Sequence, residues 1–282
     1  MKRIALLLSL FLFAACNEQK VTLAFNTQNS SGNVFAFDSK LRVLADDQNA
    51  LPGKDSAKKG LAPEAMNARL SVILSSKLID SYDDGTGRFL MNVDSVDYSS
   101  DNRSVEEFEH IEHYLKAQTF QFKMAPDGQM SSLKMEDLAS IPDAGDLDIR
   151  RNFIKIQPVL PSAPVRIGDT WERQQLVDGD SGKRLFVYKW FKIEDLFVRN
   201  GVRLAKIQMN VKYKPHDADD TGSLTSDDFV LGSGSILFDV DAGMIQEGTL
   251  EVDGKLCAVE NKGAEVLPRL RVHQSLSIRR IR

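Results

Sequence analysis

The sequence is short of the residues on which most enzymes and disulfide-stabilised folds depend. It has two cysteines, Cys16 and Cys257, and four histidines. One pair of cysteines cannot form a framework of several disulfides. The sequence also lacks a Gly-x-Ser-x-Gly elbow, a phosphate-binding glycine loop and a zinc motif, the common signatures of nucleophilic, nucleotide-binding and zinc enzymes. We therefore expect a protein that is not an enzyme.

The sequence also has neither a large excess of one charge nor a second long apolar run. The chain has 36 Lys and Arg against 40 Asp and Glu residues, or 34 against 40 when residues 1–15 are set aside. This mild acidity argues against nucleic acid as a partner. After residue 15 no apolar run approaches the ~20 residues of a membrane-spanning helix. We expect a body held to a membrane, if at all, by a lipid alone.

What the chain does have begins with an N-terminal leader. Two basic residues precede the apolar run 4–13, and two alanines precede Cys16, which is the order of a secretory signal. Small residues before a cysteine resemble the lipobox of bacterial lipoproteins, although Phe13 stands where an aliphatic residue is usual. The resemblance implies that the leader 1–15 is removed and that the Cys16 thiol is acylated. An ordinary secreted leader with an unrelated cysteine is the alternative.

The lipobox resemblance also implies a location. Acylated Cys16 would anchor the protein in a membrane, because several acyl chains hold a protein far better than one. Asn17 follows the cysteine, whereas enterobacterial sorting rules retain proteins with Asp at this position in the inner membrane. We therefore expect the periplasmic face of the outer membrane. Cys257 is expected to be a buried strand residue rather than a disulfide partner of Cys16.

Most of the body alternates apolar and polar residues, which predicts antiparallel strands. The expected strands lie at about 35–43, 68–82, 88–98, 120–122, 184–195, 202–213, 229–239, 244–252 and 269–282. Turn formers at 83–87 and 126–128 predict tight turns. The alternation changes phase between residues 93 and 96, which indicates a β-bulge. The arginines of 269–282 are interpreted as the solvent face of an edge strand, or as a contact for anionic lipid head groups.

One segment breaks the strand pattern. Ser104 and Glu107 form a capping box, and apolar residues then recur every three or four positions as far as Leu115, which predicts a helix over 104–116. Residues 135–153 are expected to hold one or two short helices. The sequence therefore predicts a mainly antiparallel β protein, a β-rich α+β fold with one amphipathic helix at about 104–116.

A fixed offset relates the two halves of the chain. Shifting residues 77–98 by 115 positions pairs identical residues at five places, including Arg88 with Arg203 and Tyr98 with Tyr213, and Gly128 meets Gly243. Any two antiparallel hairpins share some of this alternation, but a common offset over several regions favours duplication. We expect a tether at 16–33 and two related β units at 34–157 and 165–282, joined by a proline-rich connector at 158–164 and forming curved sheets or half-barrels.

A bent antiparallel sheet with an apolar-striped helix on it resembles the lipoprotein-carrier half-barrels of LolA and LolB. The stretch 160–171 (LPSAPVRIGDTW) also resembles a family of uncharacterised bacterial lipoproteins. The carrier resemblance implies a concave face that holds acyl chains. The second resemblance implies no established activity.

Two polar segments are candidates for metal binding. Residues 217–228 space their oxygens as a calcium loop does, with Asp217, Asp219, Thr221 and Asp228 as candidate ligands. Asp228 is shorter than the usual Glu, so a solvated acidic loop is the alternative. The acidic and histidine residues of 107–113 share a helix, but a single helix rarely completes such a site. We expect no cofactor, with calcium as the one candidate.

Two functions follow from these features. The first is a non-catalytic module that binds an apolar or amphipathic ligand in the concave sheet beneath helix 104–116. The second is a structural or interaction lipoprotein whose sheet docks another envelope protein and holds no small molecule. A large apolar cavity would favour the first, and a filled core the second.

Overall fold

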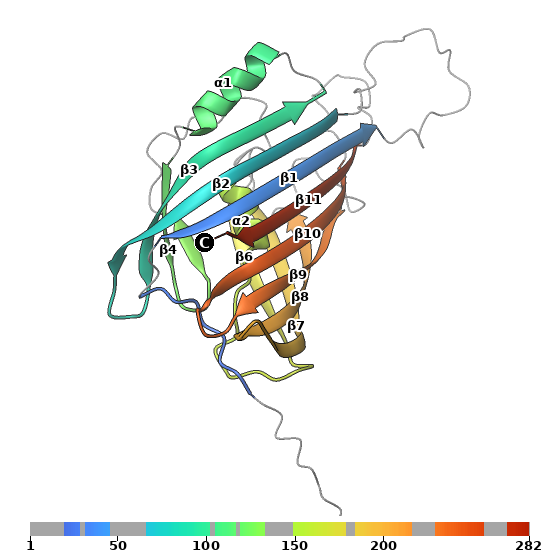
Figure 1. Cartoon of the computed structure of the whole chain (residues 1–282). Coiled ribbons are helices and arrows are strands. Elements are labelled where there is room, and N and C mark those ends of the chain that lie inside the picture. Colours follow the sequence, from blue (N-terminus) through green and yellow to red (C-terminus); the bar gives the residue numbers. More distant parts are fainter. Residues whose placement is uncertain are drawn as a thin grey trace, which may run out of the picture.

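The computed structural model describes residues 20–28, 32–45, 66–101, 105–116, 119–132, 149–178, 184–215, 229–256 and 270–281. Within them the chain forms eleven strands of one sheet and two helices (Figure 1). The strands are β1 (Asn33–Ala45), β2 (Met66–Ser81), β3 (Gly87–Ser100), β4 (Thr119–Met124), β5 (Met130–Ser132), β6 (Thr170–Asp178), β7 (Arg184–Arg199), β8 (Val202–Pro215), β9 (Phe229–Asp239), β10 (Met244–Leu256) and β11 (Leu270–Arg280). The helices are α1 (Val105–Lys116) and α2 (Ile149–Ile156).

All pairings in the sheet are antiparallel, and the strand order is β5-β4-β3-β2-β1-β11-β10-β9-β8-β7-β6. The predicted mainly antiparallel β fold is confirmed. β1 to β5 form one meander and β6 to β11 another. The pairing of β1 with β11 joins the two meanders into one continuous, open, curved sheet (Figure 1).

The interpretation of 269–282 as an edge strand is wrong. β11 pairs with β1 on one side and with β10 on the other, so it lies in the middle of the sheet. Arg271 and Arg279 are exposed, as expected for outward side chains. Outward charges occur on any strand with one wet face, so they do not distinguish a central strand from an edge strand.

Strand alternation gives the sheet an apolar inner face and a polar outer face. On β1, for example, Phe35, Phe37 and Leu41 are buried, whereas Lys40 and Arg42 are exposed. The predicted bulge is confirmed: the register shifts between the pairs Ile73–Ser95 and Leu74–Val93, so Asp94 is the extra residue. Further register shifts interrupt the β2–β3, β7–β8 and β9–β10 ladders. Bulges increase local twist, which helps the sheet to curve around its inner face.

The concave face is filled by α2. Phe153 of this helix meets the rings of Phe35 and Phe122 at centroid distances of 6.5 and 6.3 Å. Ile156 is fully buried. Gly248 of β10 makes room for it, since a Cβ there would lie 3.4 Å from Ile156 Cδ1. α2 is the part of the expected helical region 135–153 that the structure describes, and it extends three residues beyond it.

α1 confirms the helix predicted over 104–116, with its first described residue at Val105. Its apolar side chains pack on the second half of β3, which follows the residues 87–92 that pair with β4. Ile111 and Leu115 are buried, and the Phe108 ring meets Tyr98 edge-on at 5.7 Å. The helix against the middle of the concave face is therefore α2 and not α1. Neither described helix has the length and apolar character needed to cross a membrane.

Residues 20–28 and 157–165 close the lower part of the fold in extended form. Val21 pairs with Val165 in both directions at 2.8 Å, and Leu160 N donates to Asp127 O at 2.6 Å. Leu23 and Leu160 are buried. Part of the expected tether and part of the expected connector are thus bonded into the folded body.

Elements of the second meander repeat the first at the predicted offset in some places. β3 and β8 have the same length, and their bounds differ by 115 positions. Gly128 and Gly243 both have positive φ, +84° and +64°, and both are buried. The hairpins differ, since 82–86 join β2 to β3 whereas Asn200 and Gly201 alone join β7 to β8. Duplication stays a prediction.

Candidate binding site

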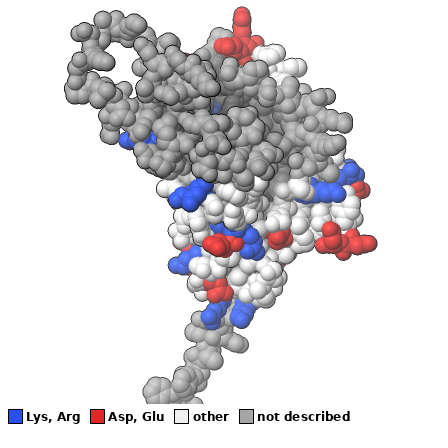
Figure 2. Space-filling view, turned by 180° about the vertical axis from the view of Figure 1, so that it is seen from behind, with Lys and Arg blue, Asp and Glu red and all other residues white. Residues whose placement is uncertain are grey.

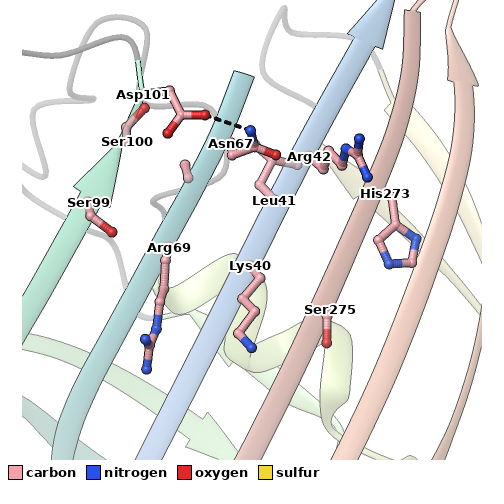
Figure 3. Close-up of a pocket in the computed structure, with 11 residues that line it drawn as sticks. Lys40, Leu41, Arg42, Asn67, Arg69, Ser99, Ser100, Asp101, His273 and Ser275 are labelled. Atoms are coloured by element: carbon pink, nitrogen blue, oxygen red, sulfur yellow. Dashed lines mark hydrogen bonds between the residues drawn. The ribbon is translucent and has the colours of Figure 1, made fainter. Parts of the chain in front are cut away.

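A groove of about 390 Å³ lies on the outer face of β3, β2, β1 and β11, near the end of the sheet where β1 terminates (Figure 3). Apart from Leu41, which is buried on the inner face, the labelled side chains point away from α2, which lies behind the strands in this view. Two rows of residues cross the four strands here. The first row is Ser99, Arg69, Lys40 and Ser275, and the second is Asp101, Asn67, Arg42 and His273.

Strand register alone creates these rows. Lys40 of β1 lies opposite Arg69 of β2 and Ser275 of β11, and Arg42 lies opposite Asn67 and His273. Successive outward residues on a strand are two positions apart, so the rows are neighbours on the sheet surface. Residues from four segments of the chain thereby meet in one polar groove.

Two cations of the groove are open to solvent. Among the described residues, the side chains of Lys40 and Arg42 have neither an ion pair nor a hydrogen bond, and both are exposed. Arg69 has a distant partner, with 3.9 Å between its Nη2 and Asp38 Oδ1. Asp101 accepts a hydrogen bond of 2.6 Å from Asn67 Nδ2. Among the described residues, no carboxylate pairs with the two cations at the centre of the groove.

The β11 wall of the groove carries a hydroxyl, a carboxylate and an imidazole. Ser275 Oγ donates to Glu251 Oε1 at 2.7 Å, and the other Glu251 oxygen lies 3.3 Å from His273 Nε2. His273 Nδ1 lies 2.9 Å from Asp253. In a serine triad the imidazole stands between serine and carboxylate so that it accepts the serine proton. Here the carboxylate stands between them, which orders the wall without activating Ser275.

The concave face leaves little free space. Over the described residues, a cavity of about 50 Å³ lies between Phe25, Phe89, Phe122 and α2. Drug-sized ligands occupy pockets of ~300–1,000 Å³, and this cavity has room for only a few water molecules. Gln157, whose Oε1 has no hydrogen-bond partner, borders it. As the described chain stands, an acyl chain does not fit beside α2.

A buried lysine holds the end of α2 in place. Lys189 of β7 is 3% exposed, and its Nζ donates to the carbonyl oxygens of Ile154, Lys155 and Gln157 at 3.1, 3.1 and 2.9 Å. These carbonyls end the helix and have no following turn to bond to. Burial lowers the pKa of Lys189 from 10.5 to about 7, while the three acceptors favour the charged ammonium.

A second polar contact fixes the side of α2. Gln274 of β11 is buried and donates from Nε2 to Ser39 Oγ and to Asn152 Oδ1, both at 3.2 Å. Its Oε1 accepts a hydrogen bond of 3.0 Å from Lys155 Nζ. Together with Lys189, this amide ties α2 to β1, β7 and β11. The arrangement is a structural anchor.

The structure places few of the sequence-predicted site residues. Cys16 and Cys257 lie outside the described residues, as do the candidate calcium ligands Asp217, Asp219, Thr221 and Asp228. Within the described chain, no group of three or more His, Cys, Asp or Glu side chains has the arrangement of a metal site. Trp171, the second residue of β6, stacks on Phe191 at 5.2 Å and donates to Val159 O at 2.7 Å, so it anchors the start of the strand.

Sequence reasoning missed both the groove and Lys189. Lys189 did carry a signal, because it occupies an inward position in the alternation of β7, between buried Val187 and Phe191. Lys40 and Arg42 carried none, since each looks like an ordinary outward charge until four strands are set side by side. Comparison with known proteins adds no assignment: no protein-family model matches the chain, and no curated protein matches it.

Proposed function

We propose that this chain is a non-catalytic, lipid-anchored protein of the cell envelope that docks an anionic surface of another envelope protein in its outer-face groove. The anchor is Cys16, and the expected location is the periplasmic face of the outer membrane. The observation that carries the docking proposal is the pair of cations Lys40 and Arg42, which have no ion pair or hydrogen bond with the described residues and line a groove of about 390 Å³.

Within the described residues, α2 on the concave face and the small cavity of about 50 Å³ beside it favour this function over a carrier of apolar ligands. α2 occupies the position that a ligand would take, and Lys189 and Gln274 hold it and the residue after it through five hydrogen bonds. Buried polar groups that are fully bonded hold one arrangement and resist exchange. The polar groove, in contrast, is open and has the size of a recognition site.

Site-specific photo-crosslinking in cells tests the docking. A photoreactive amino acid at Ser275 should capture a protein partner, and the double charge reversal Lys40→Glu and Arg42→Glu should remove that adduct. The same probe at Asn210, which is exposed on the outer face of β8, is the matched control and should give no such adduct. Equal capture from both positions, or capture that survives charge reversal, would contradict the proposal.

Native mass spectrometry of a form that begins at residue 17 tests the carrier alternative. We expect the mass of the protein alone and no lipid after solvent extraction. A copurifying lipid in stoichiometric amount would favour the carrier function and would require α2 to leave the concave face.

A further inference from the structure

Several hairpin turns and the first described residues of the chain lie at the same end of the sheet. The turns 82–86, 166–169, 200–201 and 240–243 lie at this end, which we call the rim. Residues 20–28 run along it, with hydrogen bonds from Phe25 N to Pro126 O and from Asn26 N to Gly243 O. In Figure 1 the blue segment that begins at residue 20 leaves the body at its lower end.

The length of the chain limits how far the rim can be from the proposed lipid anchor. Lys20 follows Cys16 by four positions. An extended chain spans at most ~3.6 Å per residue, so the two Cα atoms are at most about 14 Å apart. This is less than half the ~30 Å thickness of a bilayer's hydrocarbon core. A protein acylated at Cys16 therefore holds this end of its body next to the lipid.

Backbone pairing places an apolar side chain beside this entry. Val21 and Val165 pair antiparallel. Arg166 therefore lies beside Lys20, and Ile167 comes one position further in the direction of Cys16. The turn holds its shape through Gly168, with φ of +90°, and through the hydrogen bond from Gly168 N to Ile193 O at 2.8 Å. Ile167 is 54% exposed.

Other aliphatic side chains are exposed along the same rim. Val198, at the end of β7, is 65% exposed, and Ile281, which follows β11, is 54% exposed. Ile79, the residue skipped in the β2–β3 register, is 37% exposed. These residues are separate tips and not one contiguous patch. A protein interface needs a continuous core, whereas a lipid interface accepts single apolar tips.

Basic side chains accompany these tips. Lys20, Arg166 and Arg199 are exposed at the rim, and seen from behind, blue side chains reach the lowest described part of the surface (Figure 2). Arg199 Nη2 lies 3.8 Å from Glu247 Oε1, and Arg166 Nε lies 3.5 Å from Asp169 Oδ1. Basic groups next to apolar ones suit the boundary between acyl chains and phosphate head groups.

We infer that the rim is a lipid-contact surface, with Ile167 and Val198 inserted at the head-group boundary and Lys20, Arg166 and Arg199 on lipid phosphates. This inference rests on the proposed acylation of Cys16. It also defines the orientation of the body, because the rim of the sheet is the end that contacts the membrane. The groove lies nine residues further along β1 than Asn33, roughly 30 Å from the rim at about 3.3 Å per residue.

Fluorescence quenching on the acylated protein tests the inference. Val198→Cys is labelled with an environment-sensitive fluorophore in a Cys257→Ser background, and the protein is reconstituted in phosphatidylethanolamine–phosphatidylglycerol vesicles that carry head-group spin labels. We expect loss of fluorescence by quenching. Leu231→Cys is the matched control, because Leu231 is 45% exposed on a strand end far from the rim, and it should keep its fluorescence. Ile167→Cys provides a second probe at the rim.

The outcomes separate the inference from the function on which it rests. Mass spectrometry of the N-terminal peptide from the same sample reports whether Cys16 is acylated. Acylation with equal quenching at positions 198 and 231 would overturn the rim inference and leave the anchored function intact. A peptide without acyl chains would overturn the anchor, and with it the inference. Quenching at 198 and 167 but not at 231 supports it.

Discussion

Two lysines on the same sheet have opposite surroundings. Lys189 faces inward from β7 and donates to three carbonyl oxygens at the end of α2. Lys40 faces outward from β1 and, among the described residues, makes neither an ion pair nor a hydrogen bond. The difference shows that strand phase decides the surroundings of a cation: the inward lysine bonds to the end of α2, and the outward one faces solvent.

The largest effect should come from removing the inward cation. Lys189→Ala leaves three helix-end carbonyls unpaired and a cavity behind them, so we expect a loss of about 3 kcal/mol in the free energy of unfolding, measured by urea denaturation. Lys192→Ala, three positions along the same strand but exposed, should change it by less than about 0.5 kcal/mol. Equal losses for both variants would show that Lys189 does not hold α2.

A larger side chain on the inner face should lower the free energy of unfolding by less than the loss of Lys189 does. A Cβ at Gly248 would already lie 3.1 Å from Ile278 Cγ2, so Gly248→Val should push α2 outward and destabilise the fold by about 1–3 kcal/mol. Thr249→Val adds no bulk and faces solvent on the next position of β10, and should be close to neutral. A stable Gly248→Val variant would mean that α2 is not closely packed against β10.

The inward lysine should also make stability depend on pH. Its pKa is lowered in the folded protein from 10.5 to about 7 by burial. Between these values the unfolded chain binds more protons, so the free energy of unfolding rises with pH, by at most about 1.4 kcal/mol per unit. Urea denaturation from pH 7 to 10 should show this rise in the wild type relative to Lys189→Met. Parallel curves for the two proteins would mean that Lys189 keeps its ordinary pKa.

The smallest effect on stability should come from the outer groove. Lys40→Ala and Arg42→Ala remove no described contact and should each change the free energy of unfolding by less than about 0.5 kcal/mol. The yield of crosslinked partner from position 275 should nevertheless fall in both. Loss of stability together with loss of crosslinking would point to a structural role for these cations.

Sequence patterns predicted the elements better than their arrangement. Alternation located most strands, the capping box located α1, and the phase change located the bulge at Asp94, because each of these signals is local. The position of β11 was missed because pairing between β1 and β11 joins residues more than 220 positions apart, and no local pattern records a partner. The short β5 was not among the expected strands, and neither was β6.

The candidate site was less predictable than the fold. Lys40, Arg69 and Ser275 become neighbours only through the registers of three strands, and a shift of two residues in one ladder would dissolve the groove. Lys189, in contrast, stood at an inward position of a visible alternation. A charged residue in the apolar phase of a strand is thus a readable sign of a buried anchor, whereas outward residues become a site only through long-range pairing.

The central place of β11 has a consequence for how the protein folds. β1 precedes β11 by more than 220 positions, and one of its edges has no partner until β11 has been made. Contacts between distant parts of a chain form slowly and expose open strand edges in the meantime. The two meanders can therefore join only after residues 270–280 have been synthesised, and until then the edges of β1 and β10 that face β11 stay open to wrong partners.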